Sequence, residues 1–300
     1  MFDGFTRACI AGDGVEIALR HGGSGPPLLL LHGHPQTHVM WHRIAPRLAE
    51  SYTVICPDLR GYGDSGKPDG GADHAAYSKR AMARDAIAVM RALGFERFAV
   101  VGHDRGGRVA YRLALDHPER IAALSVLDIV PTGEHLRRAD TAFAMGYFHW
   151  FFLAQPAPLP ENLIAGDPDA FYLRRGRDLF APEALAEYRR CYTDPATIHA
   201  MCEDYRAAFT VDYPLDEVDR QAGRRIACPV LALWGAKGPM GNLYGLLGVK
   251  QNSDDALFPH QLLSVRVASL RLALGGSRCR GELAIGREPS RHELVFGRTL

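Results

Sequence analysis

The sequence has no marked excess of either charge. It contains 35 Lys and Arg residues and 34 Asp and Glu residues, which give a formal net charge of +1. Without a strong overall field, we expect no binding to nucleic acid or to an anionic membrane surface. The chain also lacks an apolar run of membrane-spanning length, and residues 1–10 lack the apolar core of a signal peptide. We therefore expect an unexported, cytoplasmic protein. Any anionic ligand would be bound by charged or polar side chains at its own site.

Cysteine is sparse and shows no metal-binding pattern. No CxxC pair and no zinc-like spacing to histidine occurs among Cys9, Cys56, Cys191, Cys202, Cys228 and Cys279. Scattered thiols of this kind are typical of reduced cytoplasmic proteins. The sequence also lacks a nucleotide-binding loop, so we predict no disulfide bond, no metal and no cofactor.

In the first half of the chain, short apolar runs alternate with amphipathic segments. This alternation predicts an α/β fold with a mostly parallel central sheet and helices on both faces. The predicted strands are Val15–Leu19, Leu28–His32, Tyr52–Cys56, Phe98–Val101, Leu124–Leu127 and Val230–Trp234. Apolar residues at helical spacing, followed by Gly94, predict a helix over Ser78–Leu93, and Gly106–Leu115 should form another.

The alternation stops between Pro131 and Ile226, where aromatic and charged residues mix with prolines. We interpret residues 132–226 as a helical cap inserted into a core formed by residues 1–131 and 227–300. From about residue 241 onward, Gly, Ser, Arg and Leu are interspersed without a strand or helix period. This tail is expected to be atypical, and either loosely packed or disordered.

The sequence around Asp104 is typical of a nucleophile elbow. The apolar strand Phe98–Val101 runs into Gly-His-Asp-Arg-Gly at residues 102–106, and a helix follows. Glycines two residues on either side permit a tight turn that lifts the Asp104 carboxylate above the sheet. A carboxylate there can displace a leaving group from a saturated carbon, forming an ester that water later cleaves. The alternative is that Asp104 only caps the helix.

Two further segments end at the same predicted sheet edge. The strand Leu28–His32 runs into a turn that contains His34, and backbone N–H groups of this turn can form one wall of an oxyanion site. The N–H of Arg105, directly after the nucleophile, would form the other wall. Asp128 follows the strand Leu124–Leu127 and places a second carboxylate at this edge, unless it serves only to form a turn.

With these residues, the chain resembles the fluoroacetate (haloacetate) dehalogenases of the α/β-hydrolase superfamily. The resemblance covers roughly Met1 to Met240 and depends on His32–Thr37, Asp58–Gly63, Gly102–Arg108, Val126–Thr132, His149–Trp150, Gln155–Pro158 and Asp204–Ala207. It implies an α/β-hydrolase fold with a helical cap and cofactor-independent hydrolysis of a short 2-halo acid to a hydroxy acid and halide. Homodimers are common in this family, so a homodimer stays open.

The resemblance also assigns roles to charged residues near the elbow. Arg105 and Arg108 match arginines that clamp the substrate carboxylate, and two residues three apart share one helix face. Guanidinium groups pair with carboxylates in a bidentate manner, which suits a haloacetate. His34 is added as a further substrate-binding candidate. Without the resemblance, surface ion pairs are the alternative explanation of the two arginines.

Further residues match the family's halide site and its catalytic acid. His149, Trp150 and Tyr205 match the donors that stabilise the leaving halide, and Asp128 matches the acid that orients the general-base histidine. Without the resemblance, a neighbouring His149 and Trp150 would be read as helix core.

The sequence departs from the family near its end. No Gly-His-Phe turn follows the last predicted strand, where only His260 and His292 remain, and chain order makes His260 the candidate general base. The loss of resemblance near residues 241–245 leads to the hypothesis that the tail is encoded in a shifted reading frame. The segment between Tyr172 and Pro182 is also shorter than in relatives and lacks their aromatic lining.

Two other functions stay open. An epoxide hydrolase would use the same Asp104 nucleophile, with Tyr147 and Tyr205 as donors to the epoxide oxygen. Arg105 and Arg108 argue against it, because an uncharged epoxide gives them nothing to bind. The second alternative is a catalytically impaired relative, or a binding module, that keeps the anion site but lacks the base.

Overall fold

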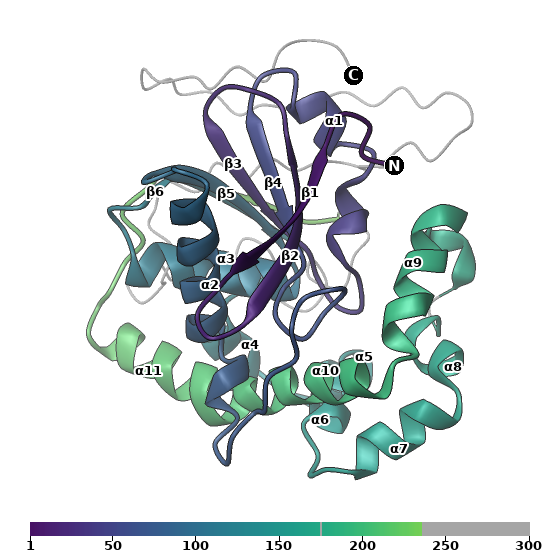
Figure 1. Cartoon of the computed structure of the whole chain (residues 1–300). Helices are drawn as coiled ribbons and strands as arrows, with labels where there is room; N and C mark the ends of the chain where they lie inside the picture. The colour runs from purple at the N-terminus through teal and green to yellow at the C-terminus, as the bar shows by residue number, and fades with distance from the viewer. Residues whose placement is uncertain (175, 236–300) are drawn as a thin grey trace, which may run out of the picture.

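The computed structural model describes residues 1–174 and 176–235 and contains a seven-stranded sheet (Figure 1). The strands follow the order β1-β2-β4-β3-β5-β6-β7 across the sheet. Their bounds are Thr6–Ala11 (β1), Glu16–Gly22 (β2), Pro27–Leu31 (β3), Thr53–Pro57 (β4), Phe98–His103 (β5), Ile121–Leu127 (β6) and Val230–Leu233 (β7). β1 and β2 pair antiparallel, whereas β4, β3, β5, β6 and β7 pair in parallel. The predicted α/β class is confirmed.

Every predicted strand overlaps an observed one, but the edge strand β1 was not predicted. Along Thr6–Ala11, exposed positions outnumber partly buried ones, and none is fully buried. Such a strand carries no continuous apolar run, in contrast to the buried parallel strands beside it. The sequence signal that identified β3 and β5 is therefore absent from β1.

Helices of the core flank the sheet and include the two that were predicted. Their bounds are His38–Trp41 (η1), Ala45–Leu48 (α1), Ala75–Tyr77 (η2), Lys79–Ala92 (α2) and Arg105–Asp116 (α3). Helix α2 begins where the Ser78 side chain accepts a hydrogen bond from the Ala81 N–H. It ends before Gly94, whose φ of +84° suits a residue without Cβ. The predicted helix over Ser78–Leu93 is confirmed.

Between β6 and β7 the chain forms a run of helices, which Figure 1 shows in teal and green below the strands. Their bounds are Thr132–Arg137 (α4), Thr141–Gly146 (α5), Phe148–Leu153 (α6), Leu159–Gly166 (α7), Pro168–Tyr172 (α8), Arg177–Leu179 (η3), Pro182–Tyr192 (α9), Pro195–Ala207 (α10), Ala208–Asp212 (η4, π-helical) and Tyr213–Gln221 (α11). The prolines of this region start helices: Pro168, Pro182 and Pro195 each occupy the first turn, where no backbone N–H is needed.

Buried ion pairs join this helical region to the core. From α3, Arg112 Nη2 lies 2.5 Å from Asp216 Oδ1 of α11, and its Nη1 bonds Asp219 of the same helix. The Tyr111 hydroxyl donates to Asp216 Oδ2 at 2.7 Å. Buried charges are stable only when paired in this way, so α11 is fixed against the helix that follows Asp104.

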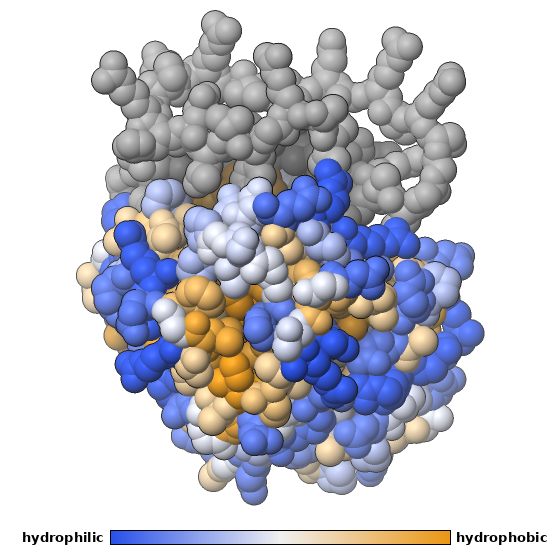
Figure 2. Space-filling model, turned by 45° about the horizontal axis from the view of Figure 1, so that its top comes forward, coloured by the Kyte–Doolittle hydropathy of each residue, from blue (hydrophilic) through white to orange (hydrophobic). Residues whose placement is uncertain are grey.

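The surface of the described residues mixes polar and apolar side chains. Hydrophilic residues cover most of the face drawn in Figure 2, and hydrophobic residues gather in one area of it. Among the helices of the described ranges, none has the length and apolar character to span a bilayer. The cysteines within these ranges are free thiols, and Cys279 lies outside them.

Candidate active site

Asp104 occupies a sharp turn between β5 and α3. Its φ of +48° and ψ of −116° are rare for a residue with a side chain, and such backbone strain persists where the surroundings fix it, often at functional sites. Its N–H donates to the Leu127 carbonyl at 3.2 Å, and its carbonyl accepts from the Arg108 N–H at 3.1 Å. The turn therefore has the form of a nucleophile elbow, as the glycine spacing predicts.

Glycines around the turn make room for close backbone approach. A Cβ on Gly102 would lie 2.3 Å from the Gly106 carbonyl oxygen, and one on Gly106 would lie 2.3 Å from the His32 carbonyl oxygen. A Cβ on Gly33 would lie 2.7 Å from the Asp104 Cβ. Because most of these obstacles are backbone atoms, a side chain would displace the turn itself.

We expect Gly106→Ala to lower the free energy of unfolding by about 3 kcal/mol, because the new methyl group overlaps backbone that cannot move aside. Urea denaturation measures this change. The control is Gly146→Ala in α5, where an added Cβ meets no heavy atom within 4 Å. It should be neutral or stabilise the fold by up to about 1 kcal/mol. Equal effects at both positions would contradict the close packing of the turn.

The Asp104 carboxylate is held by the turn that follows β3. The backbone N–H of His34 donates to Asp104 Oδ2 at 2.9 Å. Burial acts to raise the pKa of Asp104, but the charge of His103 and the hydrogen bond from His34 outweigh it. The nearby arginines act in the same direction, so the pKa lies below its ordinary value. The carboxylate is thus kept ionised, which a nucleophile requires.

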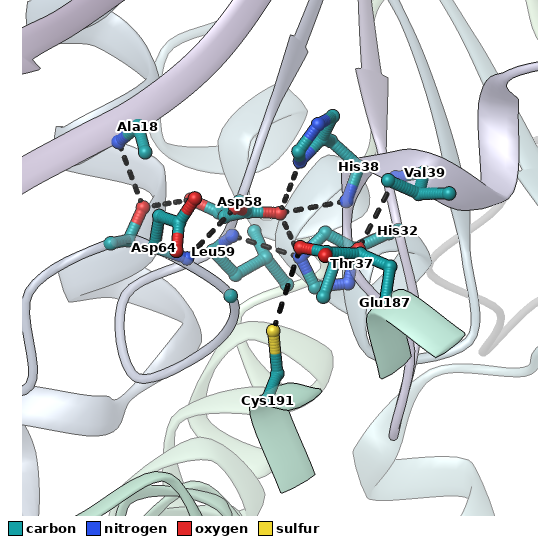
Figure 3. Close-up of polar contacts among 12 residues, drawn as sticks. Ala18, His32, Thr37, His38, Val39, Asp58, Leu59, Asp64, Glu187 and Cys191 are labelled. Atoms are coloured by element: carbon teal, nitrogen blue, oxygen red, sulfur yellow. Dashed lines mark hydrogen bonds and ion pairs between the residues drawn. The ribbon is translucent and has the colours of Figure 1, made fainter. Parts of the chain in front are cut away.

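The buried acid Asp58 binds backbone that follows the His34 turn, and Figure 3 shows the contacts of Asp58. Asp58 Oδ1 accepts from the His38 N–H at 2.7 Å and lies 2.8 Å from His38 Nδ1. Its Oδ2 accepts from the Asp64 N–H at 3.0 Å, and His32 Nε2 accepts from the Leu59 N–H at 2.9 Å. The loops that follow β3 and β4 are therefore tied together next to the nucleophile.

Arg105 is buried and is held by an acid from α10. Its Nε donates to Asp204 Oδ2 at 2.9 Å, and its Nη2 donates to Asp204 Oδ1 at 2.6 Å and to the Asp204 carbonyl at 2.8 Å. Its Nη1 is buried and has no hydrogen-bond partner within the described residues. Arg105 and Arg108 have exposures of 0% and 2%, so the alternative of surface ion pairs is wrong.

Both arginines contact the predicted halide-site residues. The Arg108 guanidinium carbon lies 4.4 Å from the Trp150 ring centroid, and that of Arg105 lies 5.2 Å from the same centroid. Arg105 also lies over the Tyr205 ring at 4.3 Å, and the His149 ring lies 5.9 Å from the Tyr205 ring. The structure therefore brings these five residues together, although they come from α3, α6 and α10.

Asp128 lies at the end of β6, next to the elbow. The last paired positions of β5 and β6 are His103 and Leu127, so Asp104 and Asp128 leave the sheet side by side. Asp128 has a φ of +53°, and its Oδ1 accepts from the Gly235 N–H at 2.8 Å. His260, the predicted base, lies outside the described residues, so its approach to Asp128 stays a prediction.

Sequence reasoning gave no role to the acid that holds Arg105. Asp204 also accepts from the Tyr62 hydroxyl at 2.7 Å and bonds Lys79 Nζ, and it is fully buried. Lys79 Nζ in turn lies 3.9 Å from Asp212 Oδ2. Asp204 stands beside Tyr205 in the sequence, but only a contact map would reveal a partner 99 residues away. The described residues contain no group of His, Cys, Asp or Glu suited to a metal ion.

Comparison with known proteins places this geometry in a family. The model of the alpha/beta hydrolase fold matches residues 26–273, which extends past Met240, where the resemblance was expected to end. A fluoroacetate dehalogenase of Burkholderia sp is 50% identical over 90% of this chain and 88% of its own length. A soluble epoxide hydrolase of Corynebacterium sp. is 36% identical over 74% of this chain and 77% of its own length.

A solved structure agrees with these matches. The crystal structure of ALR0039 from Nostoc sp PCC 7120 has a TM-score of 0.81 and 50% sequence identity, covering 86% of this chain and 90% of its own. The chain belongs to the fluoroacetate dehalogenase family of the α/β-hydrolase superfamily.

Proposed function

We propose that the protein hydrolyses the carbon–halogen bond of haloacetates and related short 2-halo acids, giving the 2-hydroxy acid and halide. The observation that supports this most is the buried Arg105 guanidinium, whose Nη1 has no partner within residues 1–174 and 176–235. A buried cationic donor needs an acceptor, and the carboxylate of a 2-halo acid supplies one next to Asp104. Family membership supports the same substrate class.

The proposed reaction has two steps. An Asp104 carboxylate oxygen attacks carbon 2, and the carbon–halogen bond breaks with its electron pair leaving on the halide. His149, Trp150 and Tyr205 receive the halide, while Arg105 and Arg108 hold the substrate carboxylate. Water then attacks the carbonyl carbon of the Asp104 ester. A general base takes the proton of this water, the hydroxy acid leaves, and the Asp104 carboxylate is restored.

For the second step we propose His260 as the general base and Asp128 as the acid that orients it. Water needs a base because the ester carbonyl is a weak electrophile at neutral pH. The backbone N–H of His34, which holds Asp104 Oδ2 at 2.9 Å, is placed to stabilise the oxyanion that forms there. No cofactor enters either step.

Epoxide hydrolysis is the weaker candidate, although relatives with that name are similar in sequence. An epoxide has no carboxylate, so it would not give the buried Nη1 of Arg105 the charged acceptor that a 2-halo acid supplies. Leaving a charged donor unpaired costs several kcal/mol, roughly 2–5 for a buried charged hydrogen bond. The arrangement therefore favours a substrate with a carboxylate.

Chloride released from chloroacetate, counted per protein chain, tests the proposed function and its base. We expect the protein to release many chloride ions per chain. His260→Ala should stop after one, with a carboxymethyl group added to the Asp104 peptide, because the first step needs no base. His292→Ala is the matched control and should turn over. If the unaltered protein also stops at one chloride, His260 is not the base; if it releases none, dehalogenation itself is wrong.

A further inference from the structure

His34, beside the nucleophile, and Tyr172, which packs on it, carry polar side-chain atoms that have no hydrogen-bond partner within the described part of the chain. Both ring nitrogens of His34 are buried and unpaired, and so is the hydroxyl of Tyr172. Tyr172 ends α8 and is only 5% exposed. The two rings pack against each other, with their centroids 5.4 Å apart.

The backbone of His34 is bonded to Asp104, and its ring packs among aromatic side chains. Its N–H donates to Asp104 Oδ2, and its ring packs 5.2 Å from the Tyr205 ring and 6.3 Å from the Tyr62 ring. These contacts are edge-to-face and satisfy packing, but they supply no acceptor or donor in the ring plane. The imidazole is therefore held beside Asp104 with its hydrogen-bonding capacity unused.

The chemistry of the pair indicates what it can bind. Burial lowers the pKa of the His34 imidazole to about 3, so the ring is neutral and offers one N–H donor and one acceptor nitrogen. The Tyr172 hydroxyl both donates and accepts. Neither group brings positive charge, so a second carboxylate would be desolvated without compensation. An uncharged hydroxyl group matches both partners.

We propose that His34 and Tyr172 form a subsite for a hydroxyl group on carbon 3 of the substrate, so that 2-halo-3-hydroxy acids are preferred over their apolar counterparts. This inference rests on the proposed function, because the same Asp104 and arginines carry the reaction. With 2-chloro-3-hydroxypropanoate, Asp104 forms the bond to carbon 2 and chloride leaves with the bonding electrons. Water then cleaves the ester, giving glycerate, with one proton released overall.

The test compares two substrates of nearly equal shape: 2-chloro-3-hydroxypropanoate, and 2-chlorobutanoate, in which a methyl group replaces the hydroxyl. The measured quantity is the ratio of their second-order rate constants for chloride release in the first turnover, corrected for release without protein. We expect the hydroxylated acid to react about 10- to 100-fold faster, because sites built around a hydroxyl discriminate strongly against its absence.

Substitutions identify the residues responsible. Tyr172→Phe and His34→Phe should each lower this ratio at least about 10-fold. Tyr188→Phe is the matched control, since Tyr188 is a buried tyrosine whose ring packs on Phe180, and it should leave the ratio as it is. Tyr172→Phe removes one unpaired oxygen and keeps the ring, so the variant should fold. It should unfold at a higher urea concentration than the unaltered protein.

Several outcomes would overturn the subsite. A ratio near one in the unaltered protein, or a ratio unchanged in both phenylalanine variants, shows that no hydroxyl is recognised. If both rate constants fall in parallel, the two side chains hold only water or support the fold. Chloroacetate separates this failure from a failure of the proposed function. If chloroacetate yields chloride while the ratio of the two rate constants stays near one, the proposed dehalogenation is supported and the hydroxyl subsite is wrong.

Discussion

Replacing Asp104 with asparagine is expected to lower the rate of chloride release from chloroacetate by at least about 10⁴-fold, as happens when an enzyme loses its nucleophile. The amide is neutral and far less nucleophilic than a carboxylate, but it has the same shape and can still accept the hydrogen bond from His34. Chloride release and the mass of the peptide containing residue 104 measure the loss of the first step together.

The control for this substitution is Asp178→Asn, which removes an exposed carboxylate from η3. It should retain the activity of the unaltered protein. The peptide mass also shows whether the asparagine has hydrolysed back to aspartate, which would restore activity slowly. Rapid chloride release from a verified Asp104→Asn protein would mean that another group attacks carbon 2 and that Asp104 is not the nucleophile.

Asp204→Asn is expected to lower the free energy of unfolding by about 3–5 kcal/mol, as is typical when a buried ion pair loses one partner. Asp204 is the shared partner of Arg105 and Lys79, so the substitution leaves two cations buried close together. Urea denaturation at pH 7 measures the change. Because the acid also orients Arg105, the chloroacetate concentration at half-maximal rate should rise by at least about 10-fold.

The matched control is Asp64→Asn, which also removes an acid that contacts two cations. Asp64 lies 2.8 Å from Arg7 and 2.8 Å from Arg190, but both arginines are more than half exposed. Exposed pairs of this kind contribute about 1 kcal/mol or less. Comparable losses at the two positions would show that burial does not set the strength of the Asp204 cluster.

The pH dependence of this stability has a defined sign. Burial acts to raise the pKa of Asp204, but Arg105 and Lys79 outweigh it and hold the pKa below the value in the unfolded chain. Because the pKa is lowered, ionised Asp204 contributes fully to the free energy of unfolding at pH values above its pKa in the unfolded chain. This contribution is lost as the pH falls through the pKa of Asp204 in the folded protein. The difference between Asp204→Asn and the unaltered protein should therefore narrow only in strong acid.

Patterns within short stretches of sequence predicted the strands, the turn and the helix start whose formation depends on neighbouring residues. The apolar runs of β3 and β5, the glycine spacing around Asp104 and the N-cap at Ser78 each depend on residues close in sequence. The edge strand β1 was not predicted, because most of its positions are exposed and it carries no apolar run. The prolines of the cap did not reveal where its helices begin, although Pro182 lies in the first turn of α9.

The candidate site was predictable only in part for a related physical reason. Arg105 and Arg108 could be placed together because three residues separate them on one helix. The partners that hold and face them come from distant segments: Asp204 is far along the chain, and the unpaired hydroxyl of Tyr172 becomes evident only from its surroundings. Contacts between distant segments leave no periodic pattern in a sequence, so the roles of these residues could be recognised only in the three-dimensional structure.

The ion pair between Arg105 and Asp204 also limits how substrate can enter. Arg105 belongs to α3 of the core, whereas Asp204 belongs to α10 of the helical region, and Arg112 of α3 makes similar bonds to α11. Swinging the helical layer open as a hinged lid would break the buried ion pairs of Arg105 and Arg112 together. We therefore expect small acids to exchange while that layer stays in place, through rotation of individual side chains or displacement of a short stretch of backbone.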